Sequence, residues 1–151
     1  MATDISIIIP AKNEAGNLTF LLPRLRQQLP NAEIIVVNDG STDNTKEICT
    51  ANNVHIVNHA SSMGNGAAIK SGARVANGEI FVFMDADGQH KVEDIERLTE
   101  SINSDHDMAV GARTRDSQAS IGRGLANAFY NWLASAMTGH IIPDLTSGFR
   151  A

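Results

Sequence analysis

The sequence contains little cysteine, no long hydrophobic run and no excess of basic charge. Among its 151 residues Cys49 is the single cysteine, which excludes an internal disulfide and is typical of a reducing compartment. No stretch approaches the roughly 18 apolar residues of a membrane-spanning helix. The first residues lack the basic and then apolar order of a signal peptide. These absences predict a soluble, intracellular, cytoplasmic protein.

The charge balance excludes a further class. Twelve Lys and Arg residues against 17 Asp and Glu residues give a net charge of −5, whereas a general nucleic-acid-binding surface needs a basic face. A hydrophobic content of 42% argues against intrinsic disorder. A chain of about 150 residues typically forms one domain that buries about 70% of its unfolded surface. We therefore expect residues 1–151 to form a single domain.

Short hydrophobic runs alternate with helix-length segments. Strands are expected at residues 5–9, 33–37, 54–57 and 80–84, with a weaker one at 108–110. Helices are expected to start near Leu18, Asp43, Ala67, Val92 and Leu125, with Pro23 kinking or restarting the first. Nearly continuous apolar strands suit a parallel sheet covered on both faces. The alternation predicts an α/β fold, with a Rossmann-like, mostly parallel sheet flanked by helices.

Polar residues follow three of the expected strands. Residues 10–14 follow the first strand, residues 38–43 the second and residues 85–90 the strand that ends at Met84. In an open parallel sheet the ligand lies outside the carboxyl ends of the strands, at the point where the strand order reverses. The sequence therefore predicts a binding site at one edge of the sheet.

Asp85 and Asp87 are the strongest candidates for metal ligands. Residues two apart in an extended segment point the same way, and two close carboxylates repel unless a cation lies between them. Mg²⁺ or Mn²⁺ binds such carboxylates together with substrate phosphates, and Gln89 could add a neutral oxygen. The alternative is a turn whose side chains cap the next helix. His90 is expected to face solvent or to cap the loop.

Glu14 and Asp39 are candidates for recognition of a nucleotide, because a carboxylate accepts hydrogen bonds from a base N–H or a ribose hydroxyl. The alternatives are ordinary turn chemistry for Asp39 and a place in the first helical turn for Glu14. The segment 64–66 has two glycines but Ile69 where a dinucleotide motif needs a third. Helix–sheet packing or close approach of the backbone to a ligand fits this segment better.

Several arginines form a second, basic group. Arg113, Arg123 and Arg150 are candidates for phosphate contacts, since the guanidinium fork matches phosphate oxygens, whereas Arg115 is expected to be a surface charge. No Ser–His–Asp arrangement, Cys–His pair or zinc-type Cys and His spacing stands out.

Four segments occur in an order that resembles a known family. They are IIIPAKNE at 7–14, VNDGSTD at 37–43, DADGQH at 85–90 and DLTSGFR at 144–150. Together they resemble the catalytic domain of a family 2 glycosyltransferase, most closely the polyprenyl-phosphate (dolichyl-phosphate) mannosyl- and glucosyltransferases. The resemblance implies a fold of the GT-A type and a hexosyltransferase activity in the synthesis of cell-envelope glycans.

The resemblance also implies roles for individual residues. The nucleotide would contact Pro10, Ala11, Asn13, Glu14, Asp39, Asp85 and Ala86. The cation, Mg²⁺ or Mn²⁺, would bind Asp85, Asp87 and Gln89. The catalytic group would be Asp87, Arg113 and Arg123. The acceptor side would include Ser147, Gly148 and Arg150.

The implied reaction moves a sugar from a UDP- or GDP-sugar to a polyprenyl phosphate with inversion. A phosphate with a second pKa of about 6 is already ionised near pH 7, so this acceptor needs no general base. Such enzymes continue with helices that meet the cytoplasmic face of a membrane. The chain ends at Ala151 directly after the fourth segment, which predicts a domain truncated at its C-terminus.

Three other functions stay open. A glycosyltransferase acting on a sugar hydroxyl would carry its base in the missing part. A nucleotidyltransferase would favour a glycine-rich, basic loop after the first strand, where this chain has only Lys12. A fragment that binds a nucleotide sugar without turnover is the third.

Overall fold

The computed structural model describes residues 4–103, 107–111 and 147–151. Within them, strands and helices alternate in the order β1 (Ile5–Ala11), α1 (Ala15–Gln28), β2 (Glu33–Asp39), α2 (Thr45–Ala51), β3 (His55–His59), α3 (Asn65–Val75), β4 (Ile80–Phe83) and α4 (Asp94–Asn103). The strands form one sheet in the order β3-β2-β1-β4, and every neighbouring pair is parallel. The predicted α/β fold with a parallel sheet is confirmed.

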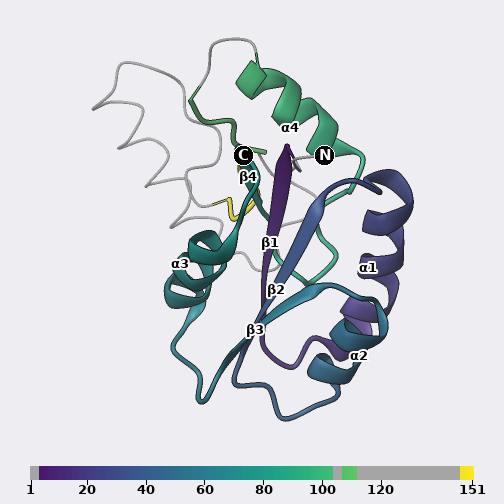
Figure 1. Cartoon of the computed structure of the whole chain (residues 1–151), viewed down its shortest axis with the longest axis vertical. Coiled ribbons are helices and arrows are strands. Elements are labelled where there is room, and N and C mark those ends of the chain that lie inside the picture. The colour runs from purple at the N-terminus through teal and green to yellow at the C-terminus, as the bar shows by residue number, and fades with distance from the viewer. Residues whose placement is uncertain (1–3, 104–106, 112–146) are drawn as a thin grey trace, which may run out of the picture.

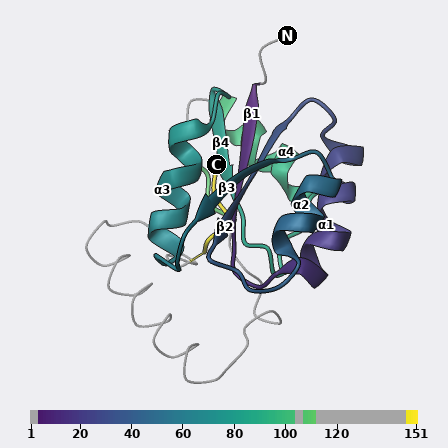
Figure 2. The same ribbon diagram turned by 60° about the horizontal axis from the view of Figure 1, so that its bottom comes forward.

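The sheet lies between two layers of helices. Helices α1, α2 and α4 cover one face and α3 covers the other (Figures 1 and 2). Alternate residues of β1 serve the two layers: Ile7 and Ile9 belong to the core under α1, and Ile8 to the core under α3. This double coverage explains why the strands are hydrophobic on both faces.

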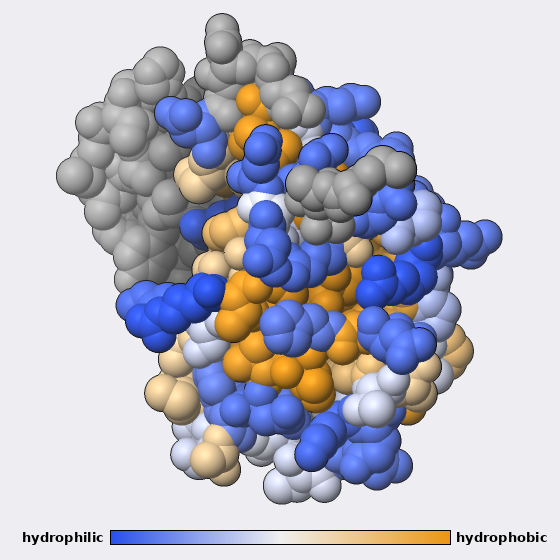
Figure 3. Space-filling model, in the orientation of Figure 1, coloured by the Kyte–Doolittle hydropathy of each residue, from blue (hydrophilic) through white to orange (hydrophobic). Residues whose placement is uncertain are grey.

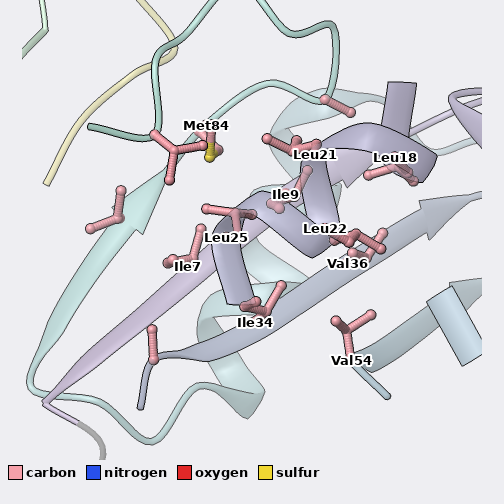
Figure 4. Close-up of a cluster of buried hydrophobic side chains, with 14 of the residues drawn as sticks. Ile7, Ile9, Leu18, Leu21, Leu22, Leu25, Ile34, Val36, Val54 and Met84 are labelled. Atoms are coloured by element: carbon pink, nitrogen blue, oxygen red, sulfur yellow. The ribbon is translucent and has the colours of Figure 1, made fainter. Parts of the chain in front are cut away.

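The larger core is built around α1. Its buried leucines, Leu18, Leu21, Leu22 and Leu25, point at β1 and β2 (Figure 4). The predicted restart at Pro23 is wrong, because α1 runs through this residue as one helix. Pro23 lies on the exposed side of α1, so the carbonyl group that loses its partner faces solvent while the leucines stay packed.

Three strands extend two residues beyond the hydrophobic runs that predicted their ends. β1 continues through Pro10 to Ala11, β2 ends at Asp39 and β3 ends at His59. The nitrogen of Pro10 points to the same side of β1 as the carbonyl of Ile8, toward β4. That carbonyl accepts from the N–H of Met84, which lies just past the end of β4, so Pro10 lies where the pairing with β4 has ended and its missing N–H is tolerated. The extension makes Asp39 and His59 register partners in neighbouring strands.

The last residues of the chain lie beside β4 (Figure 1). Phe83 and Arg150 exchange backbone hydrogen bonds of 2.7 and 3.0 Å, and Ala109 and Ala151 exchange two of 2.9 Å. The weaker strand predicted at 108–110 is present only as an isolated antiparallel bridge between Val110 and Arg150. The helix predicted from Leu125 to Met137 lies outside the described residues.

One face of the molecule exposes part of the core. Figure 3 shows hydrophobic atoms in the middle of this face, where Figure 1 places β2 and β3, surrounded by hydrophilic residues. β3 is an edge strand of the sheet, and its Ile56 and Val57 are only half-buried. Across the ranges that the structure describes, no helix has the length and apolarity needed to cross a bilayer.

Candidate functional site

The candidate site lies where the strand order reverses. The chain runs outward from β1 to β2 to β3 and then returns to place β4 on the other side of β1. The carboxyl ends of β1 and β4 are therefore adjacent, with residues 12–14 following one and residues 84–87 the other. Ligands of open α/β sheets bind at this reversal point. The acidic pair Asp85 and Asp87 follows β4 there, as predicted.

Asn13 joins the loop after β1 to the loop after β2. Its backbone has a φ of 58°, and its N–H donates to the Ser41 hydroxyl at 2.9 Å. Its side-chain oxygen accepts from the backbone N–H of Thr42 at 2.8 Å. Asparagine is one of the few residues that tolerate this left-handed conformation. The side chain predicted to contact the nucleotide thus holds two loops together.

Asp43 strengthens the same connection. One carboxylate oxygen accepts from the N–H of Ala15 at 3.0 Å, at the start of α1. The other oxygen accepts from the N–H of Thr45 at 3.0 Å and from its hydroxyl at 2.6 Å. Although burial raises the pKa of Asp43, the hydrogen bonds from Thr45 and Ala15 outweigh this and lower it. Asp43 therefore stays ionised and ties the starts of α1 and α2.

Asp39 is buried, and both of its carboxylate oxygens are occupied. Oδ1 lies 2.7 Å from Nδ1 of His59 and accepts from the N–H of Met63 at 2.7 Å. Oδ2 accepts from the Ser62 hydroxyl at 2.8 Å and from the N–H of Gly64 at 2.9 Å. An ionised carboxylate only accepts hydrogen bonds, so Nδ1 of His59 carries the proton. Asp39 thus holds the loop between β3 and α3.

These contacts set the charge of Asp39 and the shape of its loop. The N–H of Met63, and after it the His59 ring, holds the pKa of Asp39 far below its usual value despite burial. The next residue, Gly40, has a φ of +68°, and a Cβ there would lie 2.7 Å from the Ser62 nitrogen. Only glycine combines that conformation with that close approach. The loop over residues 61–64 is fixed against the end of β2 from two sides.

His59 also connects to α3. Its Nε2 lies 2.9 Å from the Ser71 hydroxyl, which completes an Asp39–His59–Ser71 chain that sequence analysis missed. The connectivity matches a nucleophilic triad, but a triad serine stands on an accessible turn beside free N–H donors. Ser71 is half-buried within α3. The hydrogen-bonded residues Asp39, His59 and Ser71 therefore connect β2, β3 and α3. The one feature of the sequence that indicates this connection is a polar residue at the end of β3.

The loop after β4 carries the predicted cation ligands. Asp87 and Gln89 are exposed, the Asp85 side chain is 41% exposed and Ala86 is buried. Oδ1 of Asp87 accepts from the N–H of Gln89 at 3.0 Å, and Gly88 between them has a φ of +75°. A turn is thus present in this loop, but Asp87 does not cap the next helix, because α4 begins only at Asp94. The Asp87 side chain stays at the surface.

The donor set suits a hard divalent cation. Mg²⁺ takes oxygen ligands, keeps several waters and binds through one or two carboxylates plus substrate phosphates, and Mn²⁺ prefers the same ligands. Asp85, Asp87 and Gln89 supply two carboxylates and an amide oxygen. In the described part of the chain, no three His, Cys, Asp or Glu residues are grouped as in a closed, zinc-type site. The residues fit Mg²⁺ or Mn²⁺ shared with a phosphate-bearing substrate.

The segment predicted for the acceptor side packs against the acidic loop. A Cβ on Gly148 would lie 2.6 Å from Oδ2 of Asp85. The Ser147 hydroxyl is buried and donates to the carbonyl of Gly111 at 2.6 Å. Nε of Arg150 donates to the Ser147 carbonyl at 2.7 Å. Ser147 and Arg150 therefore make contacts within the chain.

Of the two positions expected for His90, facing solvent or capping the loop, the first is wrong. Its side chain is 6% exposed, and its ring stacks on Phe149 with the centroids 4.8 Å apart. Neither residue was assigned a contact by sequence analysis, since 59 positions separate them. The other predicted site residues, Arg113 and Arg123, lie outside the described residues, as does Arg115.

The comparisons with known proteins agree with this geometry. The model of a family described as "Glycosyl transferase family 2" matches residues 6–151. The chain belongs to this family. The match covers both the acidic loop after β4 and the final residues, and it confirms the resemblance drawn from the four segments.

Several curated relatives act on lipid phosphates by name. A dolichol-phosphate mannosyltransferase of Pyrococcus furiosus is 38% identical over 115 residues, which cover 72% of this chain and 33% of the relative. An undecaprenyl-phosphate mannosyltransferase of Micrococcus luteus is 31% identical, covering 95% and 64%. A polyprenol monophosphomannose synthase of Mycolicibacterium smegmatis is 32% identical, covering 96% and 60%. The chain thus spans from a third to just under two thirds of these relatives' lengths.

Solved structures share the fold. Glucosyl-3-phosphoglycerate synthase of Mycobacterium tuberculosis, solved with Mn²⁺ and UDP-glucose, matches with a TM-score of 0.77 at 20% identity. The match covers 98% of this chain and 55% of that one. The fold is therefore of the GT-A type, as predicted.

Proposed function

We propose that the protein containing this chain transfers a hexose from a UDP- or GDP-sugar to a polyprenyl phosphate, with inversion at the sugar. The observation that carries the proposal is the acidic loop Asp85–Gln89 at the reversal point of a family 2 sheet. The named lipid-phosphate relatives support the choice of acceptor. The chain supplies the donor half of the reaction.

On the donor side, Pro10 and Ala11 at the end of β1 and Glu14 just before α1 flank the nucleotide, together with Asp85 and Ala86 after β4. Asn13 and Asp39 act one step removed, because their side-chain oxygens hold the loops that shape this edge. Rigid loops keep the base and ribose in one orientation, which lowers the entropic cost of reaching the reactive geometry.

Asp85, Asp87 and Gln89 would hold Mg²⁺ or Mn²⁺. When bound, the cation would supply positive charge against the charge that develops on the departing nucleoside diphosphate. Arg113 and Arg123 bind phosphate oxygens of the donor or acceptor through their guanidinium forks. Since the acceptor phosphate is ionised near pH 7, the chain needs to position it rather than deprotonate it. Ser147, Gly148 and Arg150 are assigned to the acceptor side as part of this proposal.

The lipid acceptor places the reaction at a membrane. We propose that the protein works at the cytoplasmic face, and that a part of it outside this chain contacts the lipid surface. Without that part, the chain is expected to bind the donor more readily than to complete the transfer.

Calorimetry tests the donor first. UDP-glucose and GDP-mannose are titrated into the chain with and without Mn²⁺, and we expect one of them to bind only with Mn²⁺ present. Polyprenyl phosphate is then added, and a lipid-linked sugar is expected as product. Metal-independent binding of both donors, or no binding, contradicts the proposal. Transfer to a sugar hydroxyl alone supports the competing acceptor.

A further inference from the structure

Gly148 lies close to the carboxylate of Asp85, a candidate cation ligand that is distant from it in the sequence. A Cβ on this residue would lie 2.6 Å from Oδ2 and 3.1 Å from Oδ1 of Asp85. Real Cβ atoms essentially never come closer than about 3.0 Å to another heavy atom, so a side chain at 148 would displace the carboxylate. The absence of a side chain at 148 therefore bears directly on where the Asp85 oxygens lie.

The segment 147–150 also contacts His90, the residue that follows the acidic loop Asp85–Gln89. The Phe149 ring stacks on His90 with an interplanar angle of 18°, and Nε2 of His90 lies 3.5 Å from Oδ2 of Asp85. A Cβ on Gly111 would lie 2.5 Å from the Phe149 ring, so this glycine makes room for the stack. Asp85 is thus bordered by Gly148 on one side and by His90 on another.

The segment is also anchored on its other side. Both backbone hydrogen bonds between Phe83 and Arg150 join it to the last residue of β4. The Ser147 hydroxyl donates to the Gly111 carbonyl and accepts from the N–H of Phe149 at 3.2 Å. Residues 147–150 are therefore held at a fixed distance from the strand that carries Asp85.

We propose that Gly148 and Phe149 are positioning residues for the cation site, which set the Asp85 carboxylate in the orientation that binds Mg²⁺ or Mn²⁺. This inference rests on the proposed function, because it assumes that Asp85 is a ligand. The inference gives residues 147–150 a role on the donor side in addition to the role proposed for them on the acceptor side. A segment some 60 positions downstream then completes a site that the acidic loop begins.

The test compares two glycine substitutions with opposite expected effects. Gly148→Ala forces only the end of a flexible side chain to move, so we expect a nearly unchanged Tm and at least a tenfold weaker Mn²⁺ affinity. Gly78→Ala is the matched control, because its Cβ would lie 2.7 Å from the backbone nitrogen of Ser6 at the opposite end of β1. There the backbone must shift, so we expect a lower Tm and unchanged Mn²⁺ affinity.

Mn²⁺ binding is measured by electron paramagnetic resonance with saturating UDP or GDP, whichever the chain binds. Phe149→Leu replaces the ring that stacks on His90 with a smaller aliphatic side chain. It is a second variant and is expected to weaken Mn²⁺ binding about threefold or more. It decides the matter if Gly148→Ala does not fold. Wild-type affinity in the folded variants overturns the inference. If wild-type protein binds no Mn²⁺ with either nucleotide, the proposed function fails instead.

Discussion

Replacing Asp39 by asparagine tests whether this buried carboxylate holds the protein together. The amide has the same shape, but one oxygen becomes an NH₂ group that cannot accept a hydrogen bond. If the NH₂ group replaces Oδ2, it faces the N–H of Gly64, and if it replaces Oδ1, it faces the N–H of Met63. The Ser62 hydroxyl and the His59 ring can adjust, but a backbone N–H cannot. One backbone donor therefore loses its acceptor in either orientation.

The expected loss of stability follows from the one hydrogen bond that is lost and the three that remain. Hydrogen bonds to a charged group contribute about 1.5–3 kcal/mol each, and the three that remain become weaker with a neutral acceptor. We expect Asp39→Asn to lower the free energy of unfolding by about 2–4 kcal/mol at pH 7, measured by urea denaturation with circular dichroism. Asp87→Asn is the matched control. Its side chain is exposed and makes a local bond to Gln89, so we expect a change below about 0.5 kcal/mol.

Acid gives a second measure of the same contacts. The pKa of Asp39 is lowered in the folded protein from an ordinary value of 3.8. A lowered folded pKa stabilises the protein above 3.8, and this stabilisation is lost as the pH falls through the folded pKa. The difference between wild type and Asp39→Asn is therefore expected to be full at pH 7 and to shrink below about pH 4.

Two results would refute this reasoning. One is a urea midpoint for Asp39→Asn equal to that of wild type. The other is a stability difference that stays constant down to pH 3. If stability is unchanged while nucleotide affinity falls, Asp39 serves the ligand directly rather than the loop.

Three further substitutions test other parts of the structure. Asp87→Ala is expected to abolish Mn²⁺-dependent nucleotide binding by calorimetry while its circular dichroism spectrum stays that of the wild type; unchanged affinity contradicts its assignment as a ligand. Gly16→Ala lies in α1 with nothing within 4 Å of the new Cβ, so urea denaturation should show a gain of about 0.4–1 kcal/mol, and a loss would contradict the open environment. Gly72→Ala brings its Cβ to 2.5 Å from Cγ2 of Ile8, and the same assay should show a loss of about 1–3 kcal/mol; no loss would mean that α3 can move off the sheet.

Much of the fold could be predicted because local signals carry it. Hydrophobic runs located the four parallel strands, and the leucines of α1 lie at helical spacing. The errors arise where tertiary contacts override a local rule. Pro23 does not break α1 because packed leucines surround it and its own position faces solvent. The strand ends at Asp39 and His59 were missed because paired polar residues carry no hydrophobic signal.

The sequence predicted the position of the candidate site but only some of the contacts that its residues make. The rule that ligands lie beyond strand ends located Asp85 and Asp87 at the reversal point. It gave no indication that the side-chain oxygens of Asn13 and Asp39 accept hydrogen bonds from neighbouring strands and loops, because the donor residues lie 20 or more positions away in the sequence. The contact between Gly148 and Asp85 was equally hidden, since a glycine leaves no mark of what it makes room for.

The interlocked loops after β1 and β2 have a consequence for redesign of donor preference. Asn13 reaches Ser41 and Thr42, while Asp43 reaches back to the start of α1, so each loop supplies the other's missing partners. Grafting one loop from a relative would strand polar groups in the other. Residues 12–15 and 41–45 are best exchanged together, as a single cassette.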